Sequence, residues 1–201
     1  MDTQIVLRAD GVAVLLATRQ EGLPEVVHWG RDPGELEAGD FTALDAGSAW
    51  MVPGNSLDQG LRVGVIPEAR FGWCGIPGLI GSREGRAWSP DWRVTSVLVD
   101  GQPVRGFAAC GSAQVVYEAE AVAAELRLRL VIELLPSGLV RARAHLTNLG
   151  TEAFEVQELT VRFPVPGQAR DLLDFAGRWA AERMPQRSQL GVGTHRREGR
   201  H

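Results

Sequence analysis

The stretch ELRLRLVIELLPSGLVRARAHLTNLG, residues 125–150, carries the clearest fold signal in the chain. Apolar residues occupy every second position from 126 to 134 and again from 140 to 146, with mostly charged residues between them. A period of two is typical of a β-strand with one buried side and one solvent-facing side. Pro136, Ser137 and Gly138 supply a turn between the two runs. This stretch therefore predicts an antiparallel hairpin.

Shorter segments on both sides of this hairpin repeat the strand pattern. Asp100 and Gly101 separate two apolar runs in SVLVDGQPV, which is a strong signal for a tight hairpin turn. The apolar parity changes across Gln157 and Glu158, so we expect a β-bulge there. Further strands are expected at residues 4–9, 12–18, 24–29 and 115–119. Residues 30–56 are expected to be rich in loops, with one helical turn or a strand at 44–51.

These segments together predict an all-β domain. Two large packed antiparallel sheets with few or no long helices are the most economical arrangement. The 24 glycines and 11 prolines favour many turns. The sequence does not show the alternation of strands and helices that would indicate a parallel α/β sheet.

The composition is that of an ordinary soluble globular protein. Hydrophobic residues make up 44% of the 201 residues, charged residues 23%, and the formal net charge is -4. This balance gives no reason to expect a nucleic-acid partner. The amino terminus resembles neither a signal peptide nor a membrane span, so we expect a cytoplasmic protein with no membrane partner. Cys74 and Cys110 are expected to be reduced thiols, with a single disulfide as the alternative.

No signature of a catalytic, metal or cofactor site is visible. The four histidines form no close-spaced ligand pair with a carboxylate, and no serine lies in a nucleophile elbow. His145 lies beside Arg141 and Arg143 on the polar side of its predicted strand, where we expect it to be solvated. We therefore predict no catalytic residue, no metal site and no cofactor in this chain.

One tryptophan-rich segment is a candidate for sugar binding. Trp73, Trp88 and Trp92 alternate with glycines and prolines in RFGWCGIPGLIGSREGRAWSPDW, residues 70–92. Exposed indoles on loops can stack on the C–H faces of sugars, whereas buried indoles would fill the core of the sandwich. Both interpretations stay open from the sequence.

Three motifs resemble a known family. LPEVVHWGRDPG at 23–34, GWCGIPGLIGSREGRAWSP at 72–90 and DFAGRWAAERMPQRSQLGVGTHRREGR at 174–200 are similar to the amino-terminal region of bacterial α-galactosidases of glycoside hydrolase family 36. The resemblance implies a β-supersandwich of the galactose mutarotase type. It also implies a catalytic (β/α)8 barrel, with aspartates as nucleophile and acid/base, that is missing from these residues. On this basis residues 1–171 form the supersandwich domain and residues 172–201 begin a linker toward the barrel.

The resemblance also implies roles for individual residues. In many members an Asp-Phe-Arg run precedes Pro-Ala-Leu at the rim of the substrate pocket, and here Trp73, Cys74 and Gly75 stand in its place. Trp73 is therefore a candidate rim residue, with Arg83 as the nearest cation. Trp179, Glu182 and Arg183 are expected to pack the linker against the neighbouring domains, and an exposed apolar patch is expected near them.

The expected function is support of an α-galactosidase rather than catalysis by this chain. The implied partners are α-galactoside sugars, bound weakly or only by the full-length enzyme, and further copies of the chain in a homo-oligomer. One alternative is an independent carbohydrate-binding module with Trp73, Trp88 and Trp92 as its platform. Another is a mutarotase-like sugar epimerase, which needs a histidine acid, and His145 is the available candidate.

Overall fold

The computed structural model describes residues 2–49, 63–69, 73, 75–165, 167–191, 193 and 195–196. The chain divides into two compact units, Met1–Pro164 and Val165–His201. The predicted domain boundary at 171/172 falls inside the second unit. In the described part of the chain, no helix is both long and apolar enough to cross a membrane.

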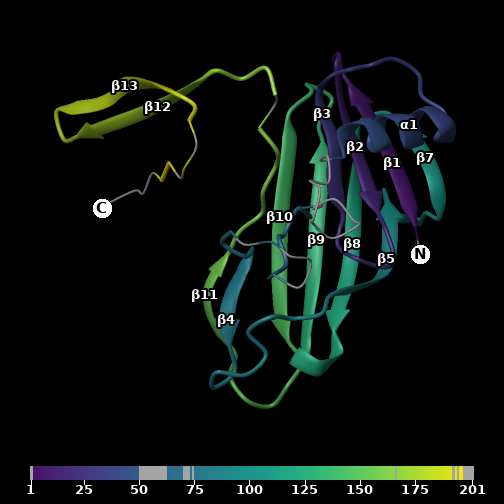
Figure 1. The fold of residues 1–201 in the computed structure, drawn as a ribbon, viewed down its shortest axis with the longest axis vertical. Helices are drawn as coiled ribbons and strands as arrows, with labels where there is room; N and C mark the ends of the chain where they lie inside the picture. The colour runs from purple at the N-terminus through teal and green to yellow at the C-terminus, as the bar shows by residue number, and fades with distance from the viewer. Residues whose placement is uncertain are drawn as a thin grey trace, which may run out of the picture. The chain divides into compact units, whose positions relative to one another are not determined.

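The first unit contains a four-stranded sheet in the order β3-β2-β1-β7 (Figure 1). Strands β1 (Thr3–Ala9), β2 (Val12–Thr18) and β3 (Glu25–Arg31) form an antiparallel meander. Asp10 and Gly11 turn the chain between β1 and β2 with φ of 48° and 73°, the left-handed conformation of a tight hairpin turn. Strand β7 (Gly106–Cys110) adds to β1 in parallel, which differs from the expected purely antiparallel arrangement.

A second, five-stranded sheet contains the hairpin predicted from residues 125–150. Its order is β10 (Val140–Asn148), β9 (Leu126–Leu134), β8 (Ala113–Ala121), β5 (Arg93–Val99) and β6 (Gln102–Pro103). All neighbours in it are antiparallel. The predicted turn at Asp100 and Gly101 is confirmed, with φ of 46° and 80°. A short 3-10 helix, Val122–Ala124, connects β8 to β9.

The inner faces of the two sheets share one hydrophobic core. Leu126, Leu128 and Leu130 of β9 are buried in the same cluster as Ile5 of β1 and Leu16 of β2. The residues that alternate with these leucines include Arg127 and Arg129, which are exposed. The period of two in the sequence thus separates a buried face from a solvent-facing one, and the prediction of an all-β domain with packed sheets is confirmed.

A helix that the sequence did not predict covers the other face of the four-stranded sheet. Helix α1 (Ala38–Ser48) buries Phe41 against Val6 and Leu15. The expectation of loops over most of this segment was wrong. The reason is that Phe41 is the one fully buried residue of the helix, so its sequence shows little helical periodicity. Residues 50 and 51 of the predicted 44–51 element lie outside the described residues.

Two smaller pairs of strands complete the structure. Strand β4 (Leu79–Ser82) pairs antiparallel with β11 (Glu155–Leu159), and the register shifts between Val156 and Glu158. This shift confirms the bulge predicted from the change of parity. In the second unit, β12 (Asp171–Arg178) and β13 (Ala181–Gln189) form an antiparallel hairpin that the sequence did not predict.

Candidate functional site

The predicted rim residue Trp73 is held by three neighbours. Its indole nitrogen donates a hydrogen bond to the carbonyl of Ile76 at 2.9 Å. The guanidinium carbon of Arg162 lies 4.5 Å from the centroid of the ring. A Cβ added at Gly75 would come within 2.5 Å of the ring, so glycine permits this close approach. The half-buried indole therefore has a fixed position and a cation over its ring.

Main-chain hydrogen bonds bring the segments of this site together. The amide of Arg162 donates to the carbonyl of Val65 at 2.8 Å. The amide of Thr160 donates to the carbonyl of Gly78 at 2.7 Å, and the amide of Gly78 donates to Pro67 at 2.9 Å. Residues after β11 are thus tied to the loop that follows Trp73. This geometry places the donors of Arg162 beside an aromatic ring, an arrangement that can bind the hydroxyl groups and the C–H face of a sugar.

Sequence reasoning did not find Arg162. The alternation of Leu159, Val161 and Phe163 indicates that Arg162 points to the other side of its segment. It gives no indication that Trp73, far away in the sequence, is the residue in contact. Only the pairing of distant segments shows that contact.

Arg83, the other predicted rim residue, lies inside the first unit and is 4% exposed. Its guanidinium donates to the carbonyl of Ala124 at 3.1 Å, to the side-chain oxygen of Asn148 at 2.9 Å and to the carbonyl of Glu152. Its Nε lies 3.9 Å from a carboxylate oxygen of Glu125. These bonds connect β4 to the turn before β9 and to the end of β10. A contact between Arg83 and a sugar stays a prediction.

The two remaining tryptophans of the segment differ in exposure. Trp88 is 65% exposed, whereas Trp92 is 1% exposed and belongs to the core between the sheets. A sugar platform that includes Trp92 is therefore wrong, because its indole is not available to a ligand. Trp88 and Trp92 both border a small, mainly apolar pocket, which is also lined by Ile66, Pro67, Pro77 and Leu79.

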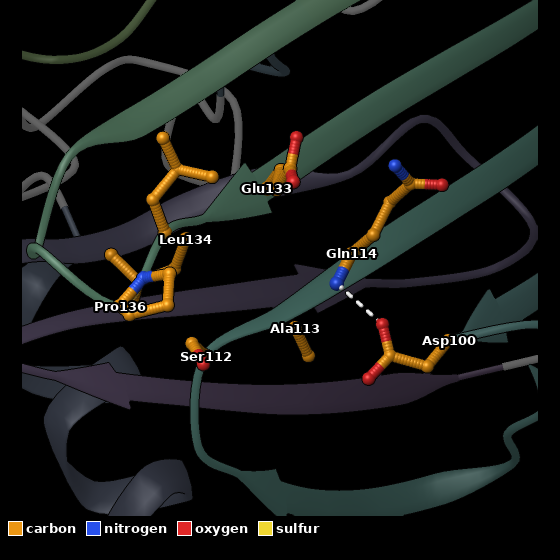
Figure 2. Close-up of a pocket in the computed structure, with 8 residues that line it drawn as sticks. Asp100, Ser112, Ala113, Gln114, Glu133, Leu134 and Pro136 are labelled. Atoms are coloured by element: carbon orange, nitrogen blue, oxygen red, sulfur yellow. Dashed lines mark hydrogen bonds between the residues drawn. The ribbon is translucent and has the colours of Figure 1, made fainter.

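A second surface pocket contains two carboxylates (Figure 2). It lies where β5 and β9 end and β8 begins, and its lining includes Asp100, Gln114 and Glu133. Asp100 accepts a hydrogen bond from the amide of Gln114 at 2.9 Å, and Glu133 accepts one from Nε of Arg141 at 2.9 Å. Each acid thus has a structural partner within the sheet. The pocket has no histidine, and these contacts do not favour an acid/base pair.

The second unit carries the other predicted residues. Trp179 is 92% exposed, and Glu182 and Arg183 are also exposed, all at or beside the turn of the β12–β13 hairpin. Glu182 accepts a hydrogen bond from the amide of Ala180 at 3.0 Å, which supports this turn. Leu173, Phe175 and Met184 are exposed apolar residues near the tail, in line with the expectation. The strand register places Leu173 and Phe175 on one face of the hairpin and Met184 on the other. The role of Trp179, Glu182 and Arg183 in docking stays a prediction.

The described residues hold no group of three or more His, Cys, Asp or Glu side chains that could bind a metal ion. His145 is exposed on the polar side of β10, as predicted. Cys110 is a free, half-buried thiol, and Cys74 lies outside the described residues.

The family model for the glycosyl hydrolase family 36 N-terminal domain matches residues 22–201. The chain belongs to this family. An alpha-galactosidase of Escherichia coli is 27% identical over 166 residues, which are 83% of this chain and 21% of that protein. The chain thus spans about a fifth of the length of this curated relative.

Solved structures of this family show the same fold. The alpha-galactosidase from Lactobacillus brevis matches with a TM-score of 0.71 and 16% identity, over 94% of this chain and 28% of that one. A variant of the GH36 alpha-galactosidase AgaA from Geobacillus stearothermophilus, solved in complex with raffinose, matches with a TM-score of 0.70 and 16% identity. That match covers 95% of this chain and 28% of the AgaA chain.

Proposed function

We propose that this chain is the non-catalytic N-terminal domain of a longer alpha-galactosidase that removes terminal α-D-galactose from galactosides. The observation that carries the proposal is the match of the family's N-terminal domain to residues 22–201, while the same chain covers only 21% of its alpha-galactosidase relative. A catalytic (β/α)8 barrel takes about 250 residues. The described strands form the sheets of the first unit and the β12–β13 hairpin, and none of them belongs to such a barrel.

The first prediction concerns activity. The full-length product of the reading frame is expected to cleave an aryl α-galactoside, and the 201-residue chain is expected to show no cleavage above a mock purification. Release of the aryl group is the measurement. Activity of the 201-residue chain that copurifies with it through two different columns would overturn the non-catalytic assignment. A full-length product without α-galactosidase activity would overturn the choice of reaction.

The exposed apolar surface of the β12–β13 hairpin supports a further part of this proposal. Leu173 and Phe175 lie on one side of the hairpin, because residues two apart in a strand share a face. An isolated two-stranded hairpin is marginally stable in water. We propose that this surface supports the rest of the enzyme and the assembly of copies into an oligomer.

The Trp73 and Arg162 pair supports a role at the rim of the substrate pocket. The guanidinium of Arg162 lies over the ring and holds the indole in place. The N–H groups of this guanidinium can donate hydrogen bonds to sugar hydroxyls. Raffinose is a reasonable test ligand, because a family 36 relative has been solved with it. The rim would contact the part of the substrate beyond the terminal galactose, where a longer sugar offers more surface.

The second prediction follows from this contact. Trp73→Ala in the full-length enzyme is expected to raise KM for raffinose by about tenfold, equal to about 1.4 kcal/mol, with little change in kcat, because the contact binds substrate and transition state alike. Arg162→Gln is expected to raise KM in the same direction. Trp88→Ala is the control, and we expect its KM to stay near that of the parent. An unchanged KM in both Trp73→Ala and Arg162→Gln would contradict the rim assignment.

A further inference from the structure

Three buried hydroxyl groups lie in the core between the two sheets. Thr3 and Thr18 face each other across the β1–β2 pair, and Tyr117 lies on β8 of the opposite sheet. All three residues are at most 1% exposed. Thr3 and Thr18 continue the inward-facing rows of Ile5 and Leu16, and Tyr117 belongs to the same core cluster as these two residues. Polar groups at this depth are unusual and need a physical explanation.

The oxygen atoms of these three side chains have no hydrogen-bond partner among the described residues. Burial raises the pKa of the Tyr117 phenol, while the nearby hydroxyl of Thr18 opposes this effect. The phenol therefore keeps its proton at neutral pH and remains a donor. The effect of Thr18 on this pKa places the two side-chain oxygens close together. Their geometry does not meet the criteria of a hydrogen bond.

A buried hydroxyl without a partner costs about 1–3 kcal/mol. Three such groups in one core would together remove a large part of the stability of a domain. Buried water molecules remove this cost elsewhere, because one water typically makes about three hydrogen bonds to polar groups that lack other partners. Hydroxyl groups rotate freely, so each can donate to or accept from such a molecule.

We infer that Thr3, Thr18 and Tyr117 form a binding site for one ordered water molecule between the two sheets. The phenol donates to the water, and the water donates to a threonine oxygen, while the other threonine completes the set. This water joins β1 and β2 to β8 through directional bonds, whereas the surrounding contacts of Ile5 and Leu16 are apolar and non-directional. It thereby fixes how one sheet is placed on the other.

The third prediction tests the sign of a stability change. Tyr117→Phe keeps the ring and removes one bond to the water, so we expect the Tm to fall by about 2–4 °C, the shift that a domain of this size shows for about 1 kcal/mol. If the phenol instead had no partner, phenylalanine would remove an unsatisfied group and the Tm would rise. A rise would overturn the inference. Thr147→Val, at an exposed position of β10, is the control, and its Tm is expected to stay within about 1 °C.

Two further measurements keep the inference testable if one variant folds poorly. Thr18→Val and Tyr117→Phe should be non-additive, because either substitution releases the same water. A crystal structure at about 1.5 Å should show a solvent peak about 2.6–3.0 Å from all three oxygens. Hydroxyls that bond to one another or to main-chain carbonyls, with no such peak, would overturn the inference.

Discussion

Arg83→Met is expected to lower the free energy of unfolding by about 1–3 kcal/mol. Arg83 is almost fully buried, and its guanidinium donates to the carbonyls of Ala124 and Glu152 and to the side chain of Asn148. Methionine fills part of the same space but donates no hydrogen bond. The buried carbonyl of Ala124 would then lose this donor, whereas the carbonyl of Glu152 would still accept a hydrogen bond from the side-chain amide of Asn148. The desolvation cost of the Ala124 carbonyl is the main cause of the predicted loss.

Urea unfolding, followed by circular dichroism, is the measurement for Arg83→Met, and Arg86→Met is its matched control. Arg86 lies three residues away, its side chain is 67% exposed, and it contacts the carboxylate of Glu152 at 3.0 Å. Exposed pairs of this kind contribute about 0–1 kcal/mol. Equal losses in the two variants would contradict the structural role of Arg83. If Arg83→Met lowered the activity of the full-length enzyme without lowering its stability, that result would instead support a role of Arg83 at the rim of the substrate pocket.

Gly81→Ala is the other substitution for which we expect a large effect. A Cβ at this position would lie 2.3 Å from the carbonyl oxygen of Glu155 and 2.7 Å from the ring of Phe154. Glu155 is the first residue of β11, which pairs with β4, and Phe154 directly precedes it. Strands β4 and β11 must therefore move apart to make room for the Cβ. Such overpacking costs about 1–3 kcal/mol and sometimes more. We expect a loss in that range, together with faster amide exchange in β4 and β11.

Gly47→Ala provides a control of opposite sign for Gly81→Ala. Gly47 lies in helix α1, and outside the helix backbone no atom of the described residues is within 4 Å of the position that its Cβ would take. Alanine is favoured over glycine in a helix by about 0.8–1.0 kcal/mol, so this variant should be more stable than the parent. Calorimetry of both variants would measure the difference. A Gly81→Ala protein with parental stability and parental exchange in β4 would contradict the close approach of the strands.

The strands were predictable from the sequence where one face of the strand is buried and the other is exposed to solvent. The alternation from Leu126 to Leu134 reports a local physical constraint, because successive side chains of a strand point to opposite faces. The bulge beside Glu158 was predictable for the same reason. Helix α1 was not, because Phe41 alone anchors it and the remaining residues show no apolar stripe. The partner of β7 was not predictable either, since parallel pairing depends on contacts between distant segments.

The candidate site was predictable only in part. Trp73 could be selected because tryptophans on glycine-rich loops are unusual and because the surrounding motif resembles the family. Its place at the rim of the substrate pocket stays a prediction. Its neighbour Arg162 and the burial of Arg83 depend on how distant segments pair, which no local pattern encodes. The same limit applies to Trp88 and Trp92, whose sequence contexts are similar although one is exposed and the other is buried.

The parallel pairing of β1 with β7 also affects how the protein is made. Residues of β1 leave the ribosome well before their partner at Gly106–Cys110, which lies about 100 residues later in the chain. At ordinary rates of synthesis this interval is about 5–20 s. During that time one edge of β1 offers unpaired amides and carbonyls to other nascent chains. Chaperone demand in a cell that expresses this protein should therefore be greatest before residue 110 emerges.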